Sequence, residues 1–516
     1  MKTQNKKDAL IILDGMGINS AKSGNAVKHA NMPNFNEIKR KHLYTELFAS
    51  GEHVGLLPGK MGNSEVGHLN IGAGRIVKQE SKIISDSIIT SDFYQNENLL
   101  ELFDNKKKIV HVLFMLSDSG VHSLLDHLYA IIQMSKYHEK KIYLHIITDG
   151  RDSGTKQSLN FLDQIEEIIN KNNIILASVS GRYYAMDREK NWVRTKAYYD
   201  MLVFAKNHSD QSIKDNLSIK EYIKHCHSHG ETDEFIKPFI VDKKYKINNE
   251  ENILFLNFRS DRMRQIASVF NGDQKYFDIK YKADLNPALY SITEYSKDFK
   301  NITPIFKTDF LKNTLSEILS KNGFNQLKVT ETTKYAHLTY FFNGRVEKPF
   351  KNEERLLIES KKVDTFDKTP EMRAKEIYFN IRKKTNYKNY DFVLVNFSNP
   401  DMLGHTGNFK ATIKSLEIMD NYLGKMIKHL KRLGYRIIVT SDHGNCEKMI
   451  NSDGSENTSH TLNKVPFILI DEHFNKNAKL KKNGKLGDIA ATVLSMKDIK
   501  LPEEVSGDNL LETLID

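Results

Sequence analysis

The chain has 516 residues, of which 39% are hydrophobic and 28% charged, as is typical of globular proteins. This length exceeds the range in which one hydrophobic core keeps growing, so we expect two domains. The net charge of +10 raises the question of nucleic-acid binding, but the lysines are spread along the whole chain rather than gathered in one stripe or tail. We therefore expect no nucleic-acid partner.

The sequence also argues against a membrane protein. The longest apolar runs, such as residues 109–116, have the length of a strand and not of a bilayer-spanning helix. The basic N-terminus precedes an apolar run of only about six residues, which is too short for a signal peptide. Cys226 and Cys446 form no spaced framework. These features predict a cytoplasmic protein without a membrane partner.

Strand-length apolar runs alternate with stretches of helical periodicity along the chain. The predicted strands are residues 9–15, 109–117, 141–149, 174–181, 252–260, 391–399, 435–442 and 465–471. The predicted helices are residues 123–138, 159–173, 310–323 and 411–434. Because nearly continuous apolar strands alternate with helices, we predict an α/β fold with mostly parallel, covered sheets.

Side chains that commonly bind metals follow several of these strands. Asp14 ends the first strand, Asp401 and His405 follow the sixth, and Asp442 and His443 end the seventh. The carboxyl ends of parallel strands meet at one edge of a sheet, so these side chains are expected to lie close together. An aspartate after a strand is by itself more often a helix cap, and a pair four residues apart is as often a surface pair. Their joint occurrence favours a metal site.

Two further residues belong to the predicted site. His460 lies just before the last predicted strand, and Ser64 lies in a glycine-rich turn that leads into an apolar stretch. A serine hydroxyl is a poor nucleophile at neutral pH, and coordination to a divalent metal is one way to activate it. Oxygen and imidazole ligands suit Mn²⁺, Zn²⁺ or Co²⁺ better than Ca²⁺. The combination predicts a two-metal enzyme that moves a phosphoryl group through a phosphoserine.

The spacing of these residues predicts a discontinuous domain. Asp14 and Ser64 lie near the N-terminus, whereas the other five presumed ligands lie after residue 400. If all seven share one site, the chain must leave one domain near residue 78 and return to it near residue 309. We predict a metal-binding domain of residues 1–78 and 309–516, with a second α/β domain of residues 79–308 inserted into it.

Eight segments occur in a characteristic order: LDGMG, MGNSEVGHLNIGAGRIV, DGRD, SGRYYAMDR, NFRSDRMRQ, KYAHLTYFFNG, NPDMLGHTGN and SDHGN. Over essentially the whole chain, this series resembles the 2,3-bisphosphoglycerate-independent phosphoglycerate mutases of the alkaline-phosphatase-like metalloenzyme superfamily. The segment around Ser64, DGRD and DRMRQ are specific to the mutases, whereas the metal motifs alone would mark only the superfamily.

The resemblance implies an isomerase that interconverts 3-phosphoglycerate and 2-phosphoglycerate in glycolysis and gluconeogenesis, without 2,3-bisphosphoglycerate. It implies a monomer in which a phosphotransferase-like, substrate-binding domain is inserted into an alkaline-phosphatase-like domain. It assigns one Mn²⁺ to Asp401, His405 and His460, and a second to Asp14, Ser64, Asp442 and His443. It assigns substrate contacts to His122, Arg151, Asp152, Arg182, Arg188, Arg259, Arg262 and Lys334.

The residue types in the inserted domain suit an acidic metabolite. Carboxylate and phosphate groups match the planar guanidinium fork, and Arg259 and Arg262, three residues apart after an apolar strand, favour an anion clamp. A single arginine is otherwise a surface ion pair, and His122 alone is as well explained by packing. In the expected mechanism Lys334 stabilises the phosphoryl group, and Asp152 accepts the proton of the 2-hydroxyl while bound glycerate reorients.

Two rival interpretations remain at this point. A phosphatase, phosphopentomutase or sulfatase of the same superfamily would share the metal ligands but not the DGRD and DRMRQ segments. A basic RNA-binding or scaffold protein is suggested only by the net charge. The chain departs from the usual mutase pattern at positions that remove no catalytic group, namely Met16, Ser119, Leu124, Thr333 and Arg345.

Overall fold

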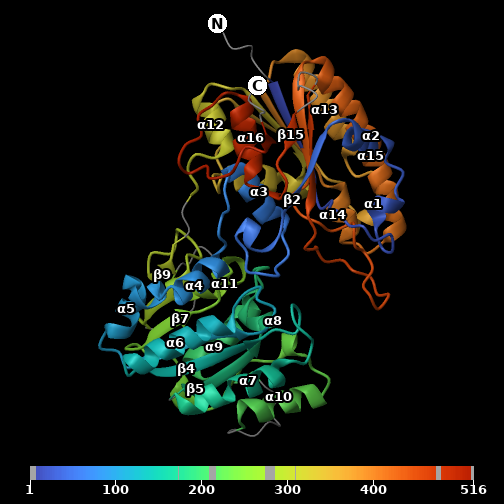
Figure 1. Cartoon of the computed structure of the whole chain (residues 1–516). Helices are drawn as coiled ribbons and strands as arrows, with labels where there is room; N and C mark the ends of the chain where they lie inside the picture. The colour runs from blue at the N-terminus through green and yellow to red at the C-terminus, as the bar shows by residue number, and fades with distance from the viewer. Residues whose placement is uncertain are drawn as a thin grey trace. The chain divides into compact units, whose positions relative to one another are not determined.

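The computed structural model describes residues 7–172, 174–208, 217–272, 285–307, 310–471 and 478–512. It forms two compact units, Met1–Gln79 with Phe310–Asp516 and, between them in the chain, Glu80–Asp309 (Figure 1). The predicted return point at residues 308 and 309 lies outside the described residues. Among the described helices, none combines the length and the apolar character needed to cross a bilayer.

The first unit is built on an eight-stranded sheet. The strands from β11 to β13 run parallel, whereas β14 is antiparallel to both of its neighbours. The predicted mostly parallel α/β architecture is therefore confirmed. In order across the sheet, the strands are β11 (Glu353–Ile358), β10 (Gln326–Glu331), β12 (Phe392–Phe397), β1 (Lys7–Leu13), β13 (Tyr435–Thr440), β14 (Val465–Ile470), β2 (Leu43–Phe48) and β16 (Gly484–Lys485).

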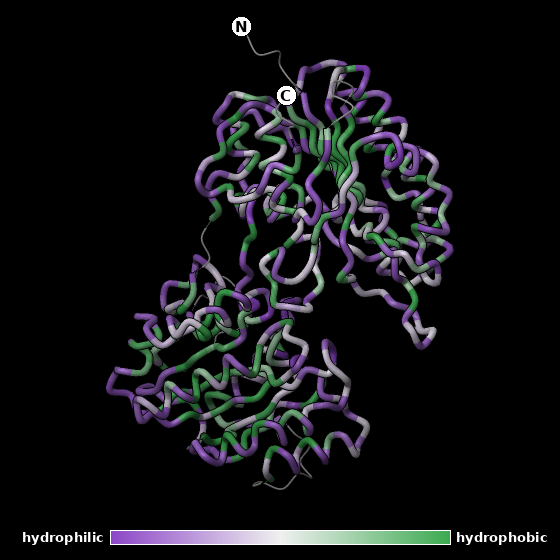
Figure 2. Tube along the Cα trace, in the orientation of Figure 1, coloured by the Kyte–Doolittle hydropathy of each residue, from purple (hydrophilic) through white to green (hydrophobic). Residues whose placement is uncertain are grey.

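Helices cover both faces of this sheet, because its central strands are apolar on both sides. In β1, Ile11 and Leu13 pack into one core cluster, and Leu10 and Ile12 pack into another. Figure 2 shows these strands as a hydrophobic bundle inside a more polar shell. One layer contains α1 (Ala26–His29), α2 (Pro33–Lys41), α13 (Ala374–Tyr387) and α15 (Phe409–Arg432), and the other contains α3 (Ser64–Ala73), α12 (Leu315–Lys321) and α16 (Asp488–Met496) (Figure 1).

The second unit has its own seven-stranded sheet, in which only β6 is antiparallel to its neighbour. Across the sheet, the strands are β6 (Phe239–Ile240), β5 (Ile174–Gly181), β4 (Lys141–Thr148), β3 (Ile109–Leu116), β7 (Asn252–Phe255), β8 (Ala288–Thr293) and β9 (Ile302–Phe306). One core cluster includes α4 (Glu80–Ile89), α5 (Glu97–Asp104), α6 (Leu125–Tyr137), α7 (Ser158–Lys171) and α10 (Ile219–Ser228), and the other includes α8 (Arg182–Ala185), α9 (Trp192–Phe204) and α11 (Ser260–Asn271).

Some predicted elements differ from those observed. The helix predicted over 310–323 begins only at Leu315, because Asn313 has a left-handed φ of 55° and Thr314 caps the helix by accepting from the Glu317 amide. Strand β10 was not predicted, since its sequence QLKVTE places a buried lysine and a buried glutamate where a core strand normally has apolar residues.

Candidate functional site

Ser64 lies at the first turn of α3, where its side chain is buried. Asn63 caps the helix by accepting from the Val66 amide at 3.0 Å. The Ser64 Oγ lies 2.6 Å from Lys334 Nζ, 3.1 Å from Asp14 Oδ1 and 3.0 Å from His443 Nε2. The positive end of the helix dipole and the lysine both favour negative charge on this oxygen.

The ends of β1 and β13 supply one group of ligand atoms. Asp14 follows β1, and Asp442 and His443 follow β13, so the pairing of these two strands brings the three residues to one edge of the sheet. All three are fully buried, and their ligand atoms lie within 4.8 Å of one another. His443 Nε2 lies 3.5 Å from Asp14 Oδ1 and 3.6 Å from Asp442 Oδ2.

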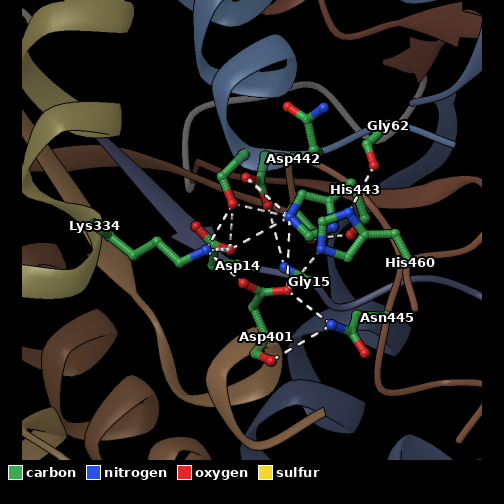
Figure 3. Close-up of polar contacts among 12 residues, drawn as sticks. Asp14, Gly15, Gly62, Lys334, Asp401, Asp442, His443, Asn445 and His460 are labelled. Atoms are coloured by element: carbon green, nitrogen blue, oxygen red, sulfur yellow. Dashed lines mark hydrogen bonds and ion pairs between the residues drawn. The ribbon is translucent and has the colours of Figure 1, made fainter. Parts of the chain in front are cut away.

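A second group forms around Asp401, in α14 (Asn399–Gly404), which follows β12. Its Oδ1 lies 3.2 Å from Nε2 of His405, one helical turn later, and 3.3 Å from Nε2 of His460. The two imidazole Nε2 atoms are themselves 3.0 Å apart. Figure 3 shows Asp14, Asp401, Asp442, His443 and His460 converging on one region.

The hydrogen bonds of the two imidazoles indicate that this second group suits a cation. His405 Nδ1 lies 2.8 Å from the carbonyl oxygen of Thr458, and His460 Nδ1 lies 2.9 Å from that of Gly62. A carbonyl oxygen only accepts, so each Nδ1 carries a proton, and each ring in its neutral form presents the lone pair of Nε2 to the other group members. Two lone pairs and a carboxylate oxygen then face one another within 3.3 Å, which is the donor set of a metal site.

Lys334 is the buried cation between the two groups. Its Nζ lies 2.7 Å from Asp14 Oδ1 and 2.5 Å from Asp401 Oδ2 (Figure 3). Burial would lower the pKa of Lys334, but the charges of Asp14 and Asp401 raise it above the ordinary value, so the lysine stays protonated. Burial would likewise raise the pKa of Asp14, yet the nearby Lys334 charge lowers it. The carboxylates of Asp14, Asp401 and Asp442 outnumber the positive charges of Lys334 and His443, so the site favours a further cation.

His443 is the most strongly perturbed histidine of the site. Burial acts to lower its pKa, but the Asp442 charge and a hydrogen bond to Asp14 raise it to about 10. Burial also lowers the pKa of His460, and the neighbouring His443 adds to this effect. For His405, burial acts to lower the pKa, but the hydrogen bond to Asp401, the charge of Asp401 and the hydrogen bond to Thr458 together raise it.

Three buried residues of this site were not among the predicted ones. Asn396 Nδ2 donates to Asp14 Oδ2 at 2.7 Å, and Asn445 Nδ2 donates to Asp401 Oδ1 at 2.8 Å. His68 lies one helical turn after Ser64, with its Nδ1 3.1 Å from Asp442 Oδ2. The four-residue spacing between Ser64 and His68 is a signal that could have identified the histidine.

The second unit gathers the remaining predicted residues at the carboxyl ends of its parallel strands. Arg182 is buried at the start of α8, where Nη1 lies 2.5 Å from Asp152 Oδ2 and Nη2 lies 3.1 Å from His122 Nε2. Asp149, which the sequence analysis did not single out, accepts from the same Nη1 at 2.6 Å. Contacts with His122 and Arg182 hold the pKa of Asp152 well below its ordinary value, so its carboxylate is ionised.

The other four arginines are more accessible. Arg188 Nη1 and Arg259 Nε share Asp261, at 2.7 and 3.1 Å, and Arg151 lies 3.6 Å from Glu234. Burial lowers the pKa of Arg262, and repulsion from Arg188, Arg182 and Arg151 lowers it further. The cluster therefore concentrates positive charge that an anion would neutralise.

Each unit thus brings its own set of predicted residues together. The first unit contains the seven presumed metal ligands, and Lys334 lies among them rather than among the arginines. The second unit contains His122, Arg151, Asp152, Arg182, Arg188, Arg259 and Arg262.

A family model described as the metalloenzyme superfamily matches residues 6–501. Two curated proteins named 2,3-bisphosphoglycerate-independent phosphoglycerate mutase are similar over nearly their whole length. The protein of Clostridioides difficile (strain 630) is 43% identical, and that of Clostridium botulinum (strain ATCC 19397 / Type A) is 42% identical; each match covers 98% of this chain and 99% of the relative. The crystal structure of Leishmania mexicana phosphoglycerate mutase at low cobalt concentration is 28% identical, covers 99% of this chain and 98% of its own, and has a TM-score of 0.73.

The fold, the two ligand groups and the family match define this chain as a member of the metalloenzyme superfamily. Within that class, the chain belongs to the 2,3-bisphosphoglycerate-independent phosphoglycerate mutases, which are isomerases. The resemblance found in the sequence segments is thereby confirmed.

Proposed function

We propose that this chain interconverts 3-phosphoglycerate and 2-phosphoglycerate through a phosphorylated Ser64 at a centre for two divalent cations. The proposal rests on the residues that surround the Ser64 hydroxyl oxygen. Ser64 Oγ, at the N-terminus of α3, lies within 3.1 Å of a lysine, an aspartate and a histidine. Lys334 and the protonated His443 stabilise an alkoxide, and Asp14, which accepts from the Ser64 hydroxyl, orients the oxygen. The printed name of the curated relatives supplies the substrate class and the independence from 2,3-bisphosphoglycerate.

The donor sets support two cation positions. Asp401, His405 and His460 would hold one cation, and Asp14, Ser64, Asp442 and His443 would hold the other. The mixture of carboxylate oxygens and imidazole nitrogens suits Mn²⁺, Zn²⁺ or Co²⁺, and the resemblance to the mutases favours Mn²⁺ among them. When bound, such ions supply Lewis-acid stabilisation of negative charge during phosphoryl transfer.

The first transfer uses residues of the first unit. Ser64 gives up its hydroxyl proton, and Oγ forms a bond to phosphorus while the bond between phosphorus and O3 of 3-phosphoglycerate breaks. Lys334, which stays protonated, stabilises the charge that develops on the phosphoryl oxygens. The departing O3 takes up a proton, so that glycerate and phosphoserine result.

The second transfer returns the phosphoryl group to O2. The arginines of the second unit hold glycerate by its carboxylate while it reorients, since guanidinium groups match that anion. Asp152, which is ionised because of its contacts with His122 and Arg182, accepts the proton of the 2-hydroxyl. The 2-oxygen bonds to phosphorus as the bond from phosphorus to Ser64 Oγ breaks. Asp152 then releases its proton to solvent and the serine takes one up, which restores both groups.

Rapid-quench labelling tests this proposal. The protein, loaded with Mn²⁺, is mixed with 3-phosphoglycerate carrying ³²P and quenched in acid, and its peptides are analysed by mass spectrometry. We expect label on the Ser64 peptide and 2-phosphoglycerate as product, and no label in Ser64→Ala. Free phosphate as the main product would indicate a phosphatase, and normal turnover without labelled protein would contradict the covalent step.

We also propose that the chain works as a cytoplasmic monomer whose partners are small molecules. The proposal rests on the diffuse distribution of its lysines and on the family resemblance. Sedimentation at working concentration tests the monomer. Binding to RNA that persists in the presence of EDTA and weakens with salt would favour the rival interpretation.

A further inference from the structure

Glu447 is a fully buried carboxylate that the mechanism above does not use. It lies at the meeting point of three segments that carry presumed metal ligands. We define these segments as the Asp14 loop (residues 14–19), the Asp442 loop (442–448) and the His460 loop (458–463). Its carboxylate accepts hydrogen bonds from all three segments.

The two oxygens of Glu447 divide the loops between them. Oε2 accepts from the Gly17 amide of the Asp14 loop at 3.0 Å and from the Asn445 amide of its own loop at 2.8 Å. Oε1 accepts from the Thr461 hydroxyl and, at 2.9 Å, from Asn463 Nδ2, both in the His460 loop. These four donors are uncharged, so the contacts fix positions by direction and distance rather than by ion pairing.

Two glycines, one on the Asp14 loop and one on the same loop as Glu447, make room for this carboxylate. A Cβ at Gly17 would lie 2.7 Å from Glu447 Oε2 and closer still to the rest of the carboxylate. A Cβ at Gly444, directly after His443, would overlap both Glu447 and Thr461. The backbones of the Asp14 loop and the Asp442 loop therefore approach Glu447 as closely as only glycine permits.

Backbone contacts extend the same connection. Cys446 N donates to Gly15 O at 3.2 Å, and Thr461 N donates to Gly444 O at 3.0 Å. The residues bonded to Glu447 are thus direct neighbours, or near neighbours, of Asp14, His443 and His460. A shift of the carboxylate would be transmitted to all three ligand residues through short, buried segments.

We propose that Glu447 is a positioning residue of the metal centre, whose carboxylate sets the mutual placement of the Asp14 loop, the Asp442 loop and the His460 loop. The inference rests on the metal ligands assigned under the proposed function. Glu447 contributes through the length of its side chain and not through its charge. An aspartate keeps the charge but is one methylene too short to bridge the loops, whereas a glutamine keeps the length and one acceptor oxygen.

The test measures Mn²⁺ binding to metal-free protein by calorimetry, together with kcat and KM. We expect Glu447→Asp to weaken Mn²⁺ affinity by about 10- to 100-fold, as is usual for residues that support metal ligands. Glu447→Gln should lose less than Glu447→Asp. With limiting Mn²⁺, kcat should fall in Glu447→Asp while the KM for 3-phosphoglycerate stays unchanged, because the arginines belong to the second unit.

Asp420 provides a matched control in the same unit. It is equally buried on α15 and accepts from the backbone amides of Asn34 and Phe35 at 3.0 and 2.7 Å, away from the three loops. Asp420→Asn should lower the unfolding temperature but leave Mn²⁺ affinity within about twofold of wild type. Equal weakening by Asp420→Asn and Glu447→Asp would mean general instability and would overturn the inference.

Two other results would also overturn it: Mn²⁺ affinity within threefold of wild type in Glu447→Asp, or a larger loss in Glu447→Gln than in Glu447→Asp. If Glu447→Asp fails to fold, Gly17→Ala provides the test, since its methyl group displaces the carboxylate. Unchanged Mn²⁺ affinity in Gly17→Ala refutes the positioning role.

Asp401→Asn separates the two proposals. If Asp401→Asn weakens Mn²⁺ binding and the Glu447 variants do not, only the inference fails; if Asp401→Asn binds Mn²⁺ normally, the ligand assignment fails with it.

Discussion

At the residue scale, the proposed mechanism depends on a single oxygen, Ser64 Oγ, and on the charges around it. Lys334 contacts this oxygen and two carboxylates at once, at distances of 2.5–2.7 Å. The cation can therefore stabilise the serine alkoxide without losing its anchoring to Asp14 and Asp401. Because Lys334 keeps its two carboxylate partners when the serine is replaced, a variant of Ser64 can test catalysis without disturbing the fold.

Ser64→Ala should abolish mutase activity while leaving the fold intact. The substitution removes the nucleophile, for which losses of about 10⁴-fold or more are usual, but Lys334 keeps both carboxylate partners. A coupled mutase assay and circular dichroism check these two outcomes. Activity within tenfold of wild type would contradict the covalent role of Ser64.

The raised pKa of His443 predicts that metal binding releases protons. With a pKa of about 10, produced against burial by Asp442 and Asp14, the metal-free imidazole is protonated at neutral pH. Only neutral imidazole binds a metal, so Mn²⁺ affinity should rise with pH, by about tenfold per pH unit for each proton released. Calorimetry at pH 8 in two buffers of different ionisation enthalpy counts these protons. Zero released protons would contradict the prediction.

At the element scale, close approaches of helices position the site. Gly67 of α3 faces Asp442, and a Cβ there would lie 2.7 Å from the Asp442 Cβ. The helix that carries Ser64 can therefore approach the strand end that carries Asp442 only because residue 67 has no side chain. The glycine-rich segment is visible in the sequence, but the close approach of Gly67 to Asp442 is visible only in the structure.

Gly67→Ala should reduce kcat by at least about 100-fold, because a displacement of about 1 Å at reacting groups has this effect. Gly424→Ala on α15 is the matched control: its Cβ would overlap the Asn34 side chain, which lies on α2. We expect this control to lose stability but to keep its turnover number. Similar kcat values for the two variants would show that α3 tolerates the shift. Steady-state kinetics at saturating Mn²⁺ provides the comparison.

The packing of α6 against α4 predicts acid sensitivity of the second unit. His127 of α6 is buried with its Nε2 3.0 Å from Ser85 Oγ, and burial lowers its pKa to about 4. In the unfolded chain this imidazole has a pKa near 6.5, so between pH 4 and pH 6.5 it is protonated in the unfolded chain and neutral in the folded chain. The stabilising effect is therefore complete above about pH 6.5 and is lost as the pH falls towards 4.

The contribution of His127 to the free energy of unfolding should fall by about 2 kcal/mol between pH 7 and pH 5. Urea unfolding of wild type and His127→Gln at both pH values measures the effect. The glutamine variant does not titrate, so its stability should decline less between pH 7 and pH 5. A parallel decline in both proteins would assign the acid sensitivity to other groups.

At the scale of the whole molecule, the two units should respond differently to metal. All presumed ligands belong to the unit of Met1–Gln79 and Phe310–Asp516. A cation held by these ligands stabilises only the folded form of that unit, so we expect Mn²⁺ to slow amide exchange in β1, β12 and β13 and to have little effect on β3, β4 and β5. Hydrogen-exchange mass spectrometry with Mn²⁺ and with EDTA tests this. Equal protection of both sheets would contradict it.

The sequence by itself determined the fold class, the family and the central strands of both sheets. Central strands such as β1 and β12 are apolar on both faces, and a strand buried on both faces must be so. The strand ends also disclosed Asp14, Asp442 and His443, since ligands gather where parallel strands end. Asp401 and His405 were recognisable as a pair because their spacing equals one helical turn.

Only the tertiary structure decided the rest. It placed Lys334 among the carboxylates, and it revealed Asn396 and Asn445 as partners of Asp14 and Asp401. It also revealed the buried Glu447, which accepts hydrogen bonds from the neighbouring loops. It also showed β10 to be a buried strand despite its polar sequence. These facts depend on contacts between residues far apart in the sequence, from 44 positions for Asn445 and Asp401 to 430 for Gly17 and Glu447, and no periodicity along the chain records such contacts. Local pattern encodes which face of an element is buried, whereas the partners of a buried polar group are set by how the elements pack.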